Sequence, residues 1–486
     1  MVFTWDKLLC DKTLTEKEKA PKSWVDYPLD PLEQDYREIV SSVSFRHLQD
    51  KAQVYQLSKG DFVRTRLTHS MEVSTIAKQL GIMMIYNPKW NKSAAFRDMS
   101  IEHARTVPTV LACTGLLHDM GNPPFGHEGE YAISSYFRES FEKGDFAFFG
   151  KPIRELFSKQ MRCDLENFEG NAQIIRILSK CRFPSEEQEA NVSYATLSAL
   201  IKYPAFSTEA YTSSDDRRIH KYSCFLSEED IYGEIRRETG LDLESEPHAR
   251  NPLTVILEAA DDIAYVASDI EDAVSKGTIS LYQLISYMKK RLAATPIEGE
   301  EEEMRKITTE GIIQNLESRL KSAESDTDRI MEFHKWTNYL RNWLMYVTAS
   351  SFVKNQEAIM NGTYAGELLE DSPHKYTVRI LKAEMYNHVY PALTDIHLAA
   401  HNILTDLLDR FINAVIYWDT IKGTTPVMKY YIDAIPERFK SAYFKEKKSD
   451  EVYNLYLRFR MVIDFLVSMS DGYALEYYKK INAILY

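Results

Sequence analysis

Helix-breaking residues are scarce in this sequence. Its 486 residues include 18 glycines and 17 prolines, and both are below the average frequencies of roughly 7% and 5%. No stretch rich in proline, glycine or serine divides the chain into parts. The length alone would allow two or three domains, but this scarcity favours one continuous helical body.

Long hydrophobic runs and paired cysteines are also lacking. No run of about 18 apolar residues occurs, and the start of the chain, MVFTWDKLLCDKTLTEKEKAPKSW, contains no apolar segment of signal-peptide length. The five cysteines show no Cys-x-x-Cys spacing, and their odd number suits a reducing compartment better than a disulfide framework. We therefore expect a cytoplasmic protein without a membrane partner.

Positive charge is in deficit as well. The chain has 59 Lys and Arg residues against 72 Asp and Glu residues, and its formal net charge at pH 7 is −13. This balance argues against a protein whose main role is to coat nucleic acid. An anionic substrate would therefore need a local cationic pocket or a metal ion.

Helical periodicity, in contrast, is abundant. Apolar residues recur at spacings of three and four in LTHSMEVSTIAKQLGIMM, VLACTGLLHDMG and LTVILEAADDIAYVASDIEDAV, which predicts an all-α fold. Alternation with a period of two is rare, so a strand, expected if anywhere around residues 218–226, should be short. The acidic run at 298–306 is expected to be a solvated helix start or loop.

This acidic run separates two regions of different composition. Residues 1–297 contain nearly all clusters of histidine and acidic residues, which predicts a catalytic core there. In the second region, residues 298–486, the part after the acidic run, residues 307–486, is rich in Tyr, Leu and Lys at helical spacing, which is typical of a packing region. We expect this second region to complete the pocket and an assembly surface, and to form one body with the core.

One histidine is predicted to point into the core from a long helix. His69 shares a helical face with Val73, Ile76 and Leu80. Taken alone, such a residue is more often a hydrogen-bonded core histidine than a ligand. Its meaning therefore depends on what other helices place beside it.

A second helix ends in a His-Asp pair. His118 follows Leu111 and Thr114 on the inward face, and Gly121 is typical of a left-handed helix stop. Asp119 would then lie at a helix carboxyl end, where the backbone dipole disfavours a negative charge. This position favours a nearby cation.

A third helix supplies a further carboxylate. Its apolar stripe leaves Asp261, Tyr265 and Asp269 aligned at i, i+4 and i+8 on the other side, which could simply be solvated. Two histidines and two aspartates on three helices nevertheless form a mixed imidazole and carboxylate set. Such a set suits Mg²⁺, Mn²⁺ or Fe²⁺ better than a thiolate-seeking metal.

The order His69, His118-Asp119 and Asp261 resembles the signature of the HD superfamily of metal-dependent phosphohydrolases. The surrounding segments are similar to those of one family within it, the deoxyguanosinetriphosphate triphosphohydrolases (dGTPases). These segments are RTRLTHSMEV, LLHDMGNPPFGHEGE, NFEGNAQ, IKYP, EAADDIAY and MSDGYA. A bare His-Asp pair is a weak signal, whereas HDxGNPPFGHxGE is highly specific. The resemblance spans most of the chain and is weakest between residues 280 and 460.

One segment departs from the family pattern. In FRHLQDKAQV, residues 45–54, the family more often has Arg-Arg-Leu and Lys-Thr-Gln, whereas this chain has His47 and Ala52. The departure concerns nucleotide recognition rather than the chemistry.

The resemblance implies a role for each matching residue. A divalent metal, Mg²⁺ or Mn²⁺ or another transition ion such as Fe²⁺, would be bound by His69, His118, Asp119 and Asp261. The catalytic pair would be His127 and Glu130. The triphosphate would meet Arg66, Lys202 and Tyr203, and the deoxyribose would be surrounded by Gln53, Tyr265 and Asp269, with Asn171 as a further pocket residue. Asp262 is the alternative to Asp261, but it is rotated by about 100° from the line of Asp261 and Tyr265.

The implied reaction is hydrolysis of a deoxynucleoside triphosphate, dGTP in the first place, to deoxynucleoside and inorganic tripolyphosphate. A cation on an α-phosphate oxygen and donors along the other phosphates would stabilise the developing charge. A histidine with a pKa near neutrality can take a proton from water or give one to the 5′-oxygen.

Two alternatives from other classes stay open. One is a different HD enzyme, such as a nucleotide phosphodiesterase or a guanosine tetraphosphate hydrolase, against which the set of Gln53, Tyr265 and Asp269 argues. The other is a nonenzymatic nucleotide sensor, against which the complete ligand set and catalytic pair argue. The resemblance further implies a homo-oligomer, such as a hexamer, and an effector that is a nucleotide or single-stranded DNA.

Overall fold

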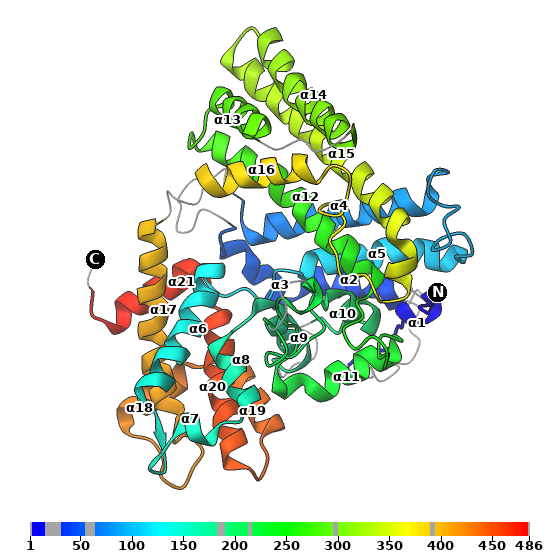
Figure 1. Ribbon diagram of the computed structural model, residues 1–486. Helices are drawn as coiled ribbons and strands as arrows, with labels where there is room; N and C mark the ends of the chain where they lie inside the picture. The colour runs from blue at the N-terminus through cyan, green and yellow to red at the C-terminus, as the bar shows by residue number, and fades with distance from the viewer. Residues whose placement is uncertain are drawn as a thin grey trace, which may run out of the picture.

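The computed structural model describes residues 2–14, 31–53, 64–181, 190–211, 216–294, 300–388 and 394–484. Across these residues the chain is mostly helical, so the predicted all-α fold is confirmed (Figure 1). The helices are α1 (Trp5–Leu8), α2 (Pro31–Ser41), α3 (Val43–Arg46), α4 (Arg66–Tyr86), α5 (Ile101–Leu117), α6 (His127–Lys143), α7 (Ile153–Leu156), α8 (Lys159–Glu166), α9 (Gly170–Ser179), α10 (Tyr194–Leu200), α11 (Glu229–Glu238), α12 (Pro252–Ser275), α13 (Leu281–Ala294), α14 (Glu300–Ser322), α15 (Asp326–Met360), α16 (Lys375–His388), α17 (Thr394–Val415), α18 (Pro426–Ala434), α19 (Glu437–Glu446), α20 (Glu451–Val467) and α21 (Asp471–Ile481). The strands β1 (Ala147–Phe148) and β2 (Lys151–Pro152) pair antiparallel. None of the described helices is both long and apolar enough to cross a membrane.

Helices α4, α5 and α12 pack against one another in the middle of the fold (Figure 1). α4 begins in a capping box, in which Thr65 and Thr68 each bind the backbone amide of the other. α5 approaches α4 so closely at Gly115 that a Cβ atom there would lie 2.4 Å from Cα of Ser74. Glycine is therefore required at this position, and the close approach brings the start of α4 beside the end of α5.

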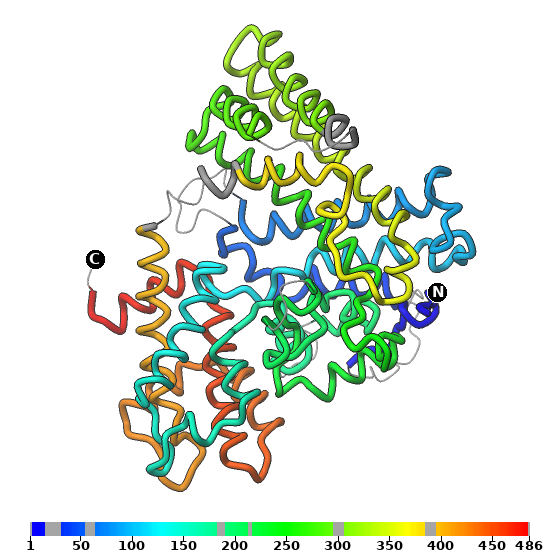
Figure 2. Tube along the Cα trace, viewed as in Figure 1, coloured from blue at the N-terminus to red at the C-terminus, as the bar shows by residue number. Residues whose placement is uncertain are grey.

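The apolar core has two parts. The first, around α4, α5 and α12, draws its residues from Phe3 to Leu381. The second combines residues between Phe125 and Phe225 with residues between Ala400 and Ala474. Helices α6 and α17 both contribute to the second part, and Figure 2 shows the cyan trace of α6 beside the orange trace of α17. Both parts contain residues from either side of residue 297, and the division into a catalytic core, residues 1–297, and a second region of the same body, residues 298–486, stays a prediction.

The structure corrects two local predictions. Residues 218–226 form no strand; they contribute to a 3₁₀ turn, Arg217–Ile219, and to one isolated bridge between Phe206 and Cys224. Gly121 does not have a positive φ angle, so it is not a left-handed helix stop. Instead, a Cβ atom on Gly121 would lie 2.0 Å from the carbonyl oxygen of Gly170, and glycine is needed because α9 approaches so closely. The acidic run does contain a helix start, because α14 begins at Glu300.

Candidate functional site

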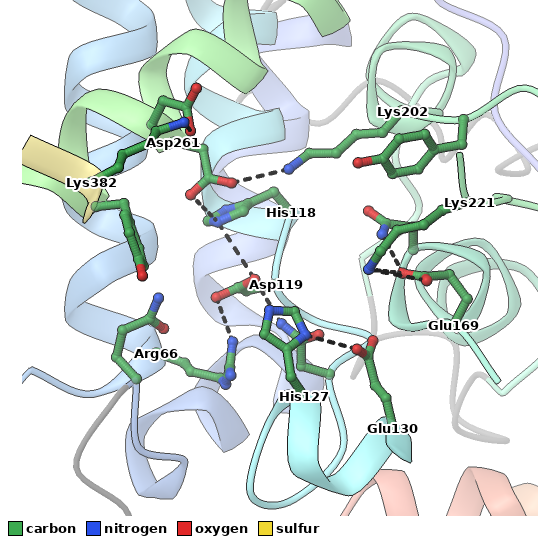
Figure 3. Close-up of a pocket in the computed structure, with 16 residues that line it drawn as sticks. Arg66, His118, Asp119, His127, Glu130, Glu169, Lys202, Lys221, Asp261 and Lys382 are labelled. Carbon is green, nitrogen blue, oxygen red and sulfur yellow. Dashed lines mark hydrogen bonds and ion pairs between the residues drawn. The ribbon is translucent and has the colours of Figure 1, made fainter. Parts of the chain in front are cut away.

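A cavity of about 350 Å³ lies between segments that are far apart in the sequence (Figure 3). Polar and charged side chains form most of its wall. They are Gln53, Arg66, His118, Asp119, Asn122, His127, Glu130, Glu169, Asn171, Lys202, Tyr203, Lys221, Asp261, Asp262, Tyr265 and Lys382. Most residues that the sequence analysis selected therefore share one site.

Four potential metal ligands meet on one side of this cavity. Ligand atoms of His69, His118 and Asp119 all lie within 4.8 Å of one another. One oxygen of Asp261 lies 3.1 Å from Nε2 of His69 and 3.4 Å from Nε2 of His118. The close packing of α4 and α5 sets this arrangement, since it places the two imidazole centroids 5.3 Å apart. The four predicted ligands thus lie together although they come from α4, from the turn that follows α5 and from α12.

The orientation of His118 fits a metal ligand. Its Nδ1 lies 2.8 Å from the carbonyl oxygen of Gly115, which can only accept a hydrogen bond, so Nδ1 carries the hydrogen and the lone pair of the neutral ring lies on Nε2. Among the described residues, the buried Nε2 atom has no well-directed hydrogen bond, although carboxylate oxygens of Asp261 and Asp119 lie 3.4 Å and 3.6 Å away. A buried polar atom without a partner requires an explanation. The carboxylates of Asp119 and Asp261 lie beside Nε2, so a divalent cation bound by all three groups would explain the buried nitrogen.

Asp119 is held from two sides. Nη1 of Arg66 donates to one of its oxygens at 2.7 Å, and Nδ2 of Asn122 donates to the other at 2.7 Å. Burial by itself would raise the pKa of Asp119, but the neighbouring imidazole of His118 and the guanidinium of Arg66 outweigh burial and lower this pKa. The carboxylate therefore stays ionised. Lys202 takes a similar place at Asp261, where its Nζ lies 3.0 Å from the second oxygen.

A hydrogen-bonded pair stands at the start of α6. Nδ1 of His127 lies 2.8 Å from one oxygen of Glu130, and the other oxygen accepts from the amide of Gly170 at 2.8 Å. The hydrogen bond with Glu130 is the main cause of a raised pKa at His127. Burial would raise the pKa of Glu130, but the hydrogen bond from His127 and the charge of Lys221 lower it to about 2. The His127 side chain is 81% exposed and faces the cavity, whereas Glu130 is buried behind it.

The wall opposite the ligands contains two residues that the sequence analysis did not select. Nζ of Lys221 lies 3.1 Å from the carboxylate of Glu169, which also accepts from Asn171 at 2.6 Å. Figure 3 shows Lys221 and Glu169 across the cavity from Asp119. Glu169 belongs to NFEGNAQ, so the family segment could have indicated it. Nothing local distinguishes Lys221, which lies in the segment that was predicted as a strand.

A further cation comes from α16. Nζ of Lys382 lies 2.7 Å from Asp262, and both side chains line the cavity. Lys382 falls where the resemblance is weakest, so no motif indicated it. Each cation of the cavity wall is paired with a carboxylate, namely Arg66 with Asp119, Lys202 with Asp261, Lys221 with Glu169 and Lys382 with Asp262.

The three residues expected around the deoxyribose are not equally placed. Gln53 and Tyr265 line the cavity, as do Tyr203 and Asn171. Asp269 does not line it; this residue is 2% exposed, and burial is the main cause of its raised pKa. Eight residues advance a helix by about 12 Å along its axis. This distance along α12, rather than rotation about the axis, carries Asp269 beyond the cavity wall, since Asp262 is rotated further from Asp261 and still lines the cavity.

Comparison with known proteins agrees with this geometry. The HD domain family matches residues 66–266 of the chain. This range contains α4, α5 and the part of α12 that carries Asp261. The fold and the site together define an HD-domain phosphohydrolase, and an HD domain implies a bound divalent metal.

Full-length relatives narrow the class to one family. The chain is 36% identical to a deoxyguanosinetriphosphate triphosphohydrolase-like protein of Listeria innocua, over 99% of both chains. It is 30% identical to a probable deoxyguanosinetriphosphate triphosphohydrolase of Pseudomonas aeruginosa and 29% identical to the deoxyguanosinetriphosphate triphosphohydrolase of Yersinia enterocolitica, in each case over 93% of both chains. The chain belongs to the dGTPase family.

Proposed function

We propose that this chain hydrolyses a deoxynucleoside triphosphate, with dGTP as the substrate, to deoxynucleoside and inorganic tripolyphosphate. The observation that carries the proposal is one cavity whose wall contains three candidate metal ligands, with His69 beside them, the His127–Glu130 pair and four cationic side chains. Such a set suits a polyanion whose reacting phosphorus lies beside the ligands. The names of the relatives support dGTP as the first substrate to test.

In this proposal a divalent cation, Mg²⁺ or Mn²⁺, is held by His69, His118, Asp119 and Asp261. When bound, such a cation withdraws electron density from the α-phosphoryl group and neutralises charge on its oxygens. Asp261 rather than Asp262 is the ligand, because an oxygen of Asp261 lies 3.1 Å from Nε2 of His69 and 3.4 Å from Nε2 of His118. Fe²⁺ suits the same imidazole and carboxylate donors.

Arg66 and Lys202 bind the triphosphate. Their present partners are the carboxylates of Asp119 and Asp261, at 2.7 Å and 3.0 Å, so their positive charges lie directly beside the ligand position. Burial raises the pKa of Tyr203, which therefore keeps its proton and can donate a hydrogen bond to a phosphate oxygen. Lys221 extends the positive charge to the opposite wall.

His127 transfers the proton. Its Nδ1 is engaged by Glu130, so Nε2 is the atom that serves the reaction. With a raised pKa, the ring can give a proton to the departing 5′-oxygen, or it can take one from the attacking water. Glu130 stabilises the charged ring and fixes its orientation through the second bond to Gly170.

Tyr265 and Gln53 meet the deoxyribose. Tyr265 lies one turn after Asp261 and lines the same cavity, so its ring would occupy the space of a 2′-hydroxyl. Asp269 is not included in this contact, because it does not line the cavity.

The test is turnover of dGTP in ¹⁸O-labelled water with Mg²⁺ or Mn²⁺, followed by mass spectrometry of the separated products. Attack on the α-phosphorus with the 5′-oxygen as leaving group places the label in tripolyphosphate and none in the deoxynucleoside. His127→Ala should slow the reaction by about 10²-fold or more. Deoxynucleoside monophosphate as the primary product would contradict this mechanism. Parallel reactions with a cyclic dinucleotide and guanosine tetraphosphate test the other HD activities, and no turnover of any substrate would indicate a sensor.

A further inference from the structure

Lys51 is a buried lysine behind the candidate site. It is 3% exposed and does not line the cavity. Its Nζ donates to the carbonyl oxygen of Asn122 at 2.7 Å and to that of Val467, the last residue of α20, at 2.6 Å. Burial is the main cause that lowers its pKa, to about 7. An ammonium in such surroundings carries a desolvation cost, so its place needs a reason.

Lys51 reaches both residues that hold Asp119. Its carbonyl oxygen accepts from the amide of Arg66 at 2.8 Å, and its ammonium binds the carbonyl of Asn122. Arg66 and Asn122 are the two residues whose side chains donate to the Asp119 carboxylate, one to each oxygen. A single residue therefore fixes both of the groups that orient this carboxylate.

Asp471 fixes the same loop from the start of α21. Its carboxylate accepts from the amide of Phe125 at 2.9 Å and from the amide of Ala52 at 3.1 Å. Phe125 has a φ angle of 65°, which is a conformation that residues other than glycine rarely adopt. The loop after Asp119 is thus tied to the carboxyl-terminal helices at Asn122 and at Phe125.

We propose that Lys51 is a positioning residue for metal binding. It holds Arg66 and Asn122 in the places from which their side chains orient Asp119. The carbonyl oxygen of Val467 anchors the Lys51 ammonium. Asp471 supports the same loop. The inference rests on the proposed metal site, but not on the proposed substrate or on the bond that breaks. Partners that orient a metal ligand typically change metal affinity by about 10- to 100-fold when they are removed.

The test is a titration of the protein with Mn²⁺ in the absence of nucleotide. The electron paramagnetic resonance signal of free Mn²⁺ measures how much of the metal is unbound. Lys51→Met keeps the length of the side chain and removes its charge and donors, and it should weaken Mn²⁺ binding by about tenfold or more. Lys51→Arg keeps donors and should recover part of the loss. Lys78→Met, at an exposed lysine of α4, is the matched control and should bind like the wild type.

A double-mutant cycle separates positioning from general damage. Asn122→Ala removes the donor through which Lys51 acts on one oxygen of Asp119. If the two residues act in series, Lys51→Met should weaken Mn²⁺ binding less in the Asn122→Ala background than in the wild type. A role in stability alone predicts a lower melting temperature with unchanged Mn²⁺ affinity.

Unchanged affinity in Lys51→Met, or equal losses in both backgrounds, would overturn the inference. If Lys51→Met does not fold, Asp471→Asn takes its place, because an amide side chain keeps only one acceptor oxygen for the two backbone amides that Asp471 binds. This variant should bind Mn²⁺ several-fold more weakly. Wild-type affinity for Mn²⁺ would count against the inference. Asp119→Ala defines binding at this site. A wild type that binds no Mn²⁺, or whose affinity Asp119→Ala leaves unchanged, would overturn the metal site itself.

Discussion

At the scale of single residues, Glu130 connects the start of α6 with the start of α9. One of its oxygens binds His127 at the start of α6, and the other accepts from Gly170 at the start of α9. The carboxylate is therefore fixed in place, and it stabilises the charged imidazole without a change of conformation. This contact is the largest cause of the raised pKa of His127.

Glu130→Gln should lower the pKa of His127, because a neutral amide does not stabilise the imidazolium. The limb of the pH profile of kcat/KM that reports His127 should then move to lower pH. If activity falls along this limb as the pH rises, His127 acts as the acid. If activity falls as the pH drops, His127 acts as the base. In both cases Glu130→Gln should move the limb to lower pH. Glu139→Gln, at an exposed glutamate of α6, is the control. A limb that does not move would show that another group sets it.

Tyr265 decides the sugar preference in our proposal. Tyr265→Ala should open the space of a 2′-hydroxyl and raise the turnover of GTP relative to dGTP. The measurement is the ratio of kcat/KM for the two nucleotides. Tyr282→Ala, at an exposed tyrosine of α13, should leave this ratio unchanged. An unchanged ratio in Tyr265→Ala would place the sugar elsewhere.

At the scale of elements, the loop between α5 and α6 depends on its contact with α9. A Cβ atom on Gly121 would lie 2.0 Å from the carbonyl oxygen of Gly170 and 2.8 Å from the amide of Ile174. Both are backbone atoms, so a side chain here can be accommodated only if the helix moves. The same helix start holds Glu130, and the contact therefore affects the site as well as the fold.

Gly121→Ala should destabilise the protein by about 1–3 kcal/mol, which is the usual effect of overpacking. Urea unfolding followed by circular dichroism measures this. Gly233→Ala in α11 is the matched control, because a Cβ atom there meets nothing within 4 Å; it should stabilise the protein by up to about 1 kcal/mol. Wild-type stability of Gly121→Ala would show that α9 can move away without cost.

At the scale of the whole molecule, the carboxyl-terminal helices complete the core of the amino-terminal half. The second part of the core joins residues before position 226 with residues after position 399. Arg176 of α9 adds buried ion pairs, 2.8 Å from Asp464 of α20 and 2.7 Å from Glu228. Removing one partner of a buried pair leaves an uncompensated charge, which costs about 3–5 kcal/mol.

A fragment of residues 1–297 should therefore not fold on its own. It lacks the apolar residues of α17 to α21 and the carboxylate of Asp464, one of those that pair with Arg176. Thermal unfolding, monitored by circular dichroism, should show a cooperative transition for the full chain and none for the fragment. A cooperative transition of the fragment would establish residues 1–297 as an independent domain.

The sequence by itself predicted the helices and selected the candidate ligand group. The periodicity within one helix decides which residues share a face, so His69 could be placed inward without knowledge of any partner. The segment HDMGNPPFGHEGE keeps Asp119, His127 and Glu130 close along the chain, and their proximity follows from connectivity. The family segments then related these residues to one reaction.

Tertiary structure alone decided which distant residues complete the site. Lys382 reaches the cavity from α16 and Lys221 reaches it from a loop. Lys51 binds the loop after Asp119 at the carbonyl of Asn122. No local sequence pattern encodes these contacts. Asp269 lies outside the cavity wall because it is two turns further along α12 than Asp261, and a glycine is required at position 121 by the approach of a separate helix rather than by its own φ angle. Periodicity fixes directions within one helix, whereas distances between helices depend on how all of them pack.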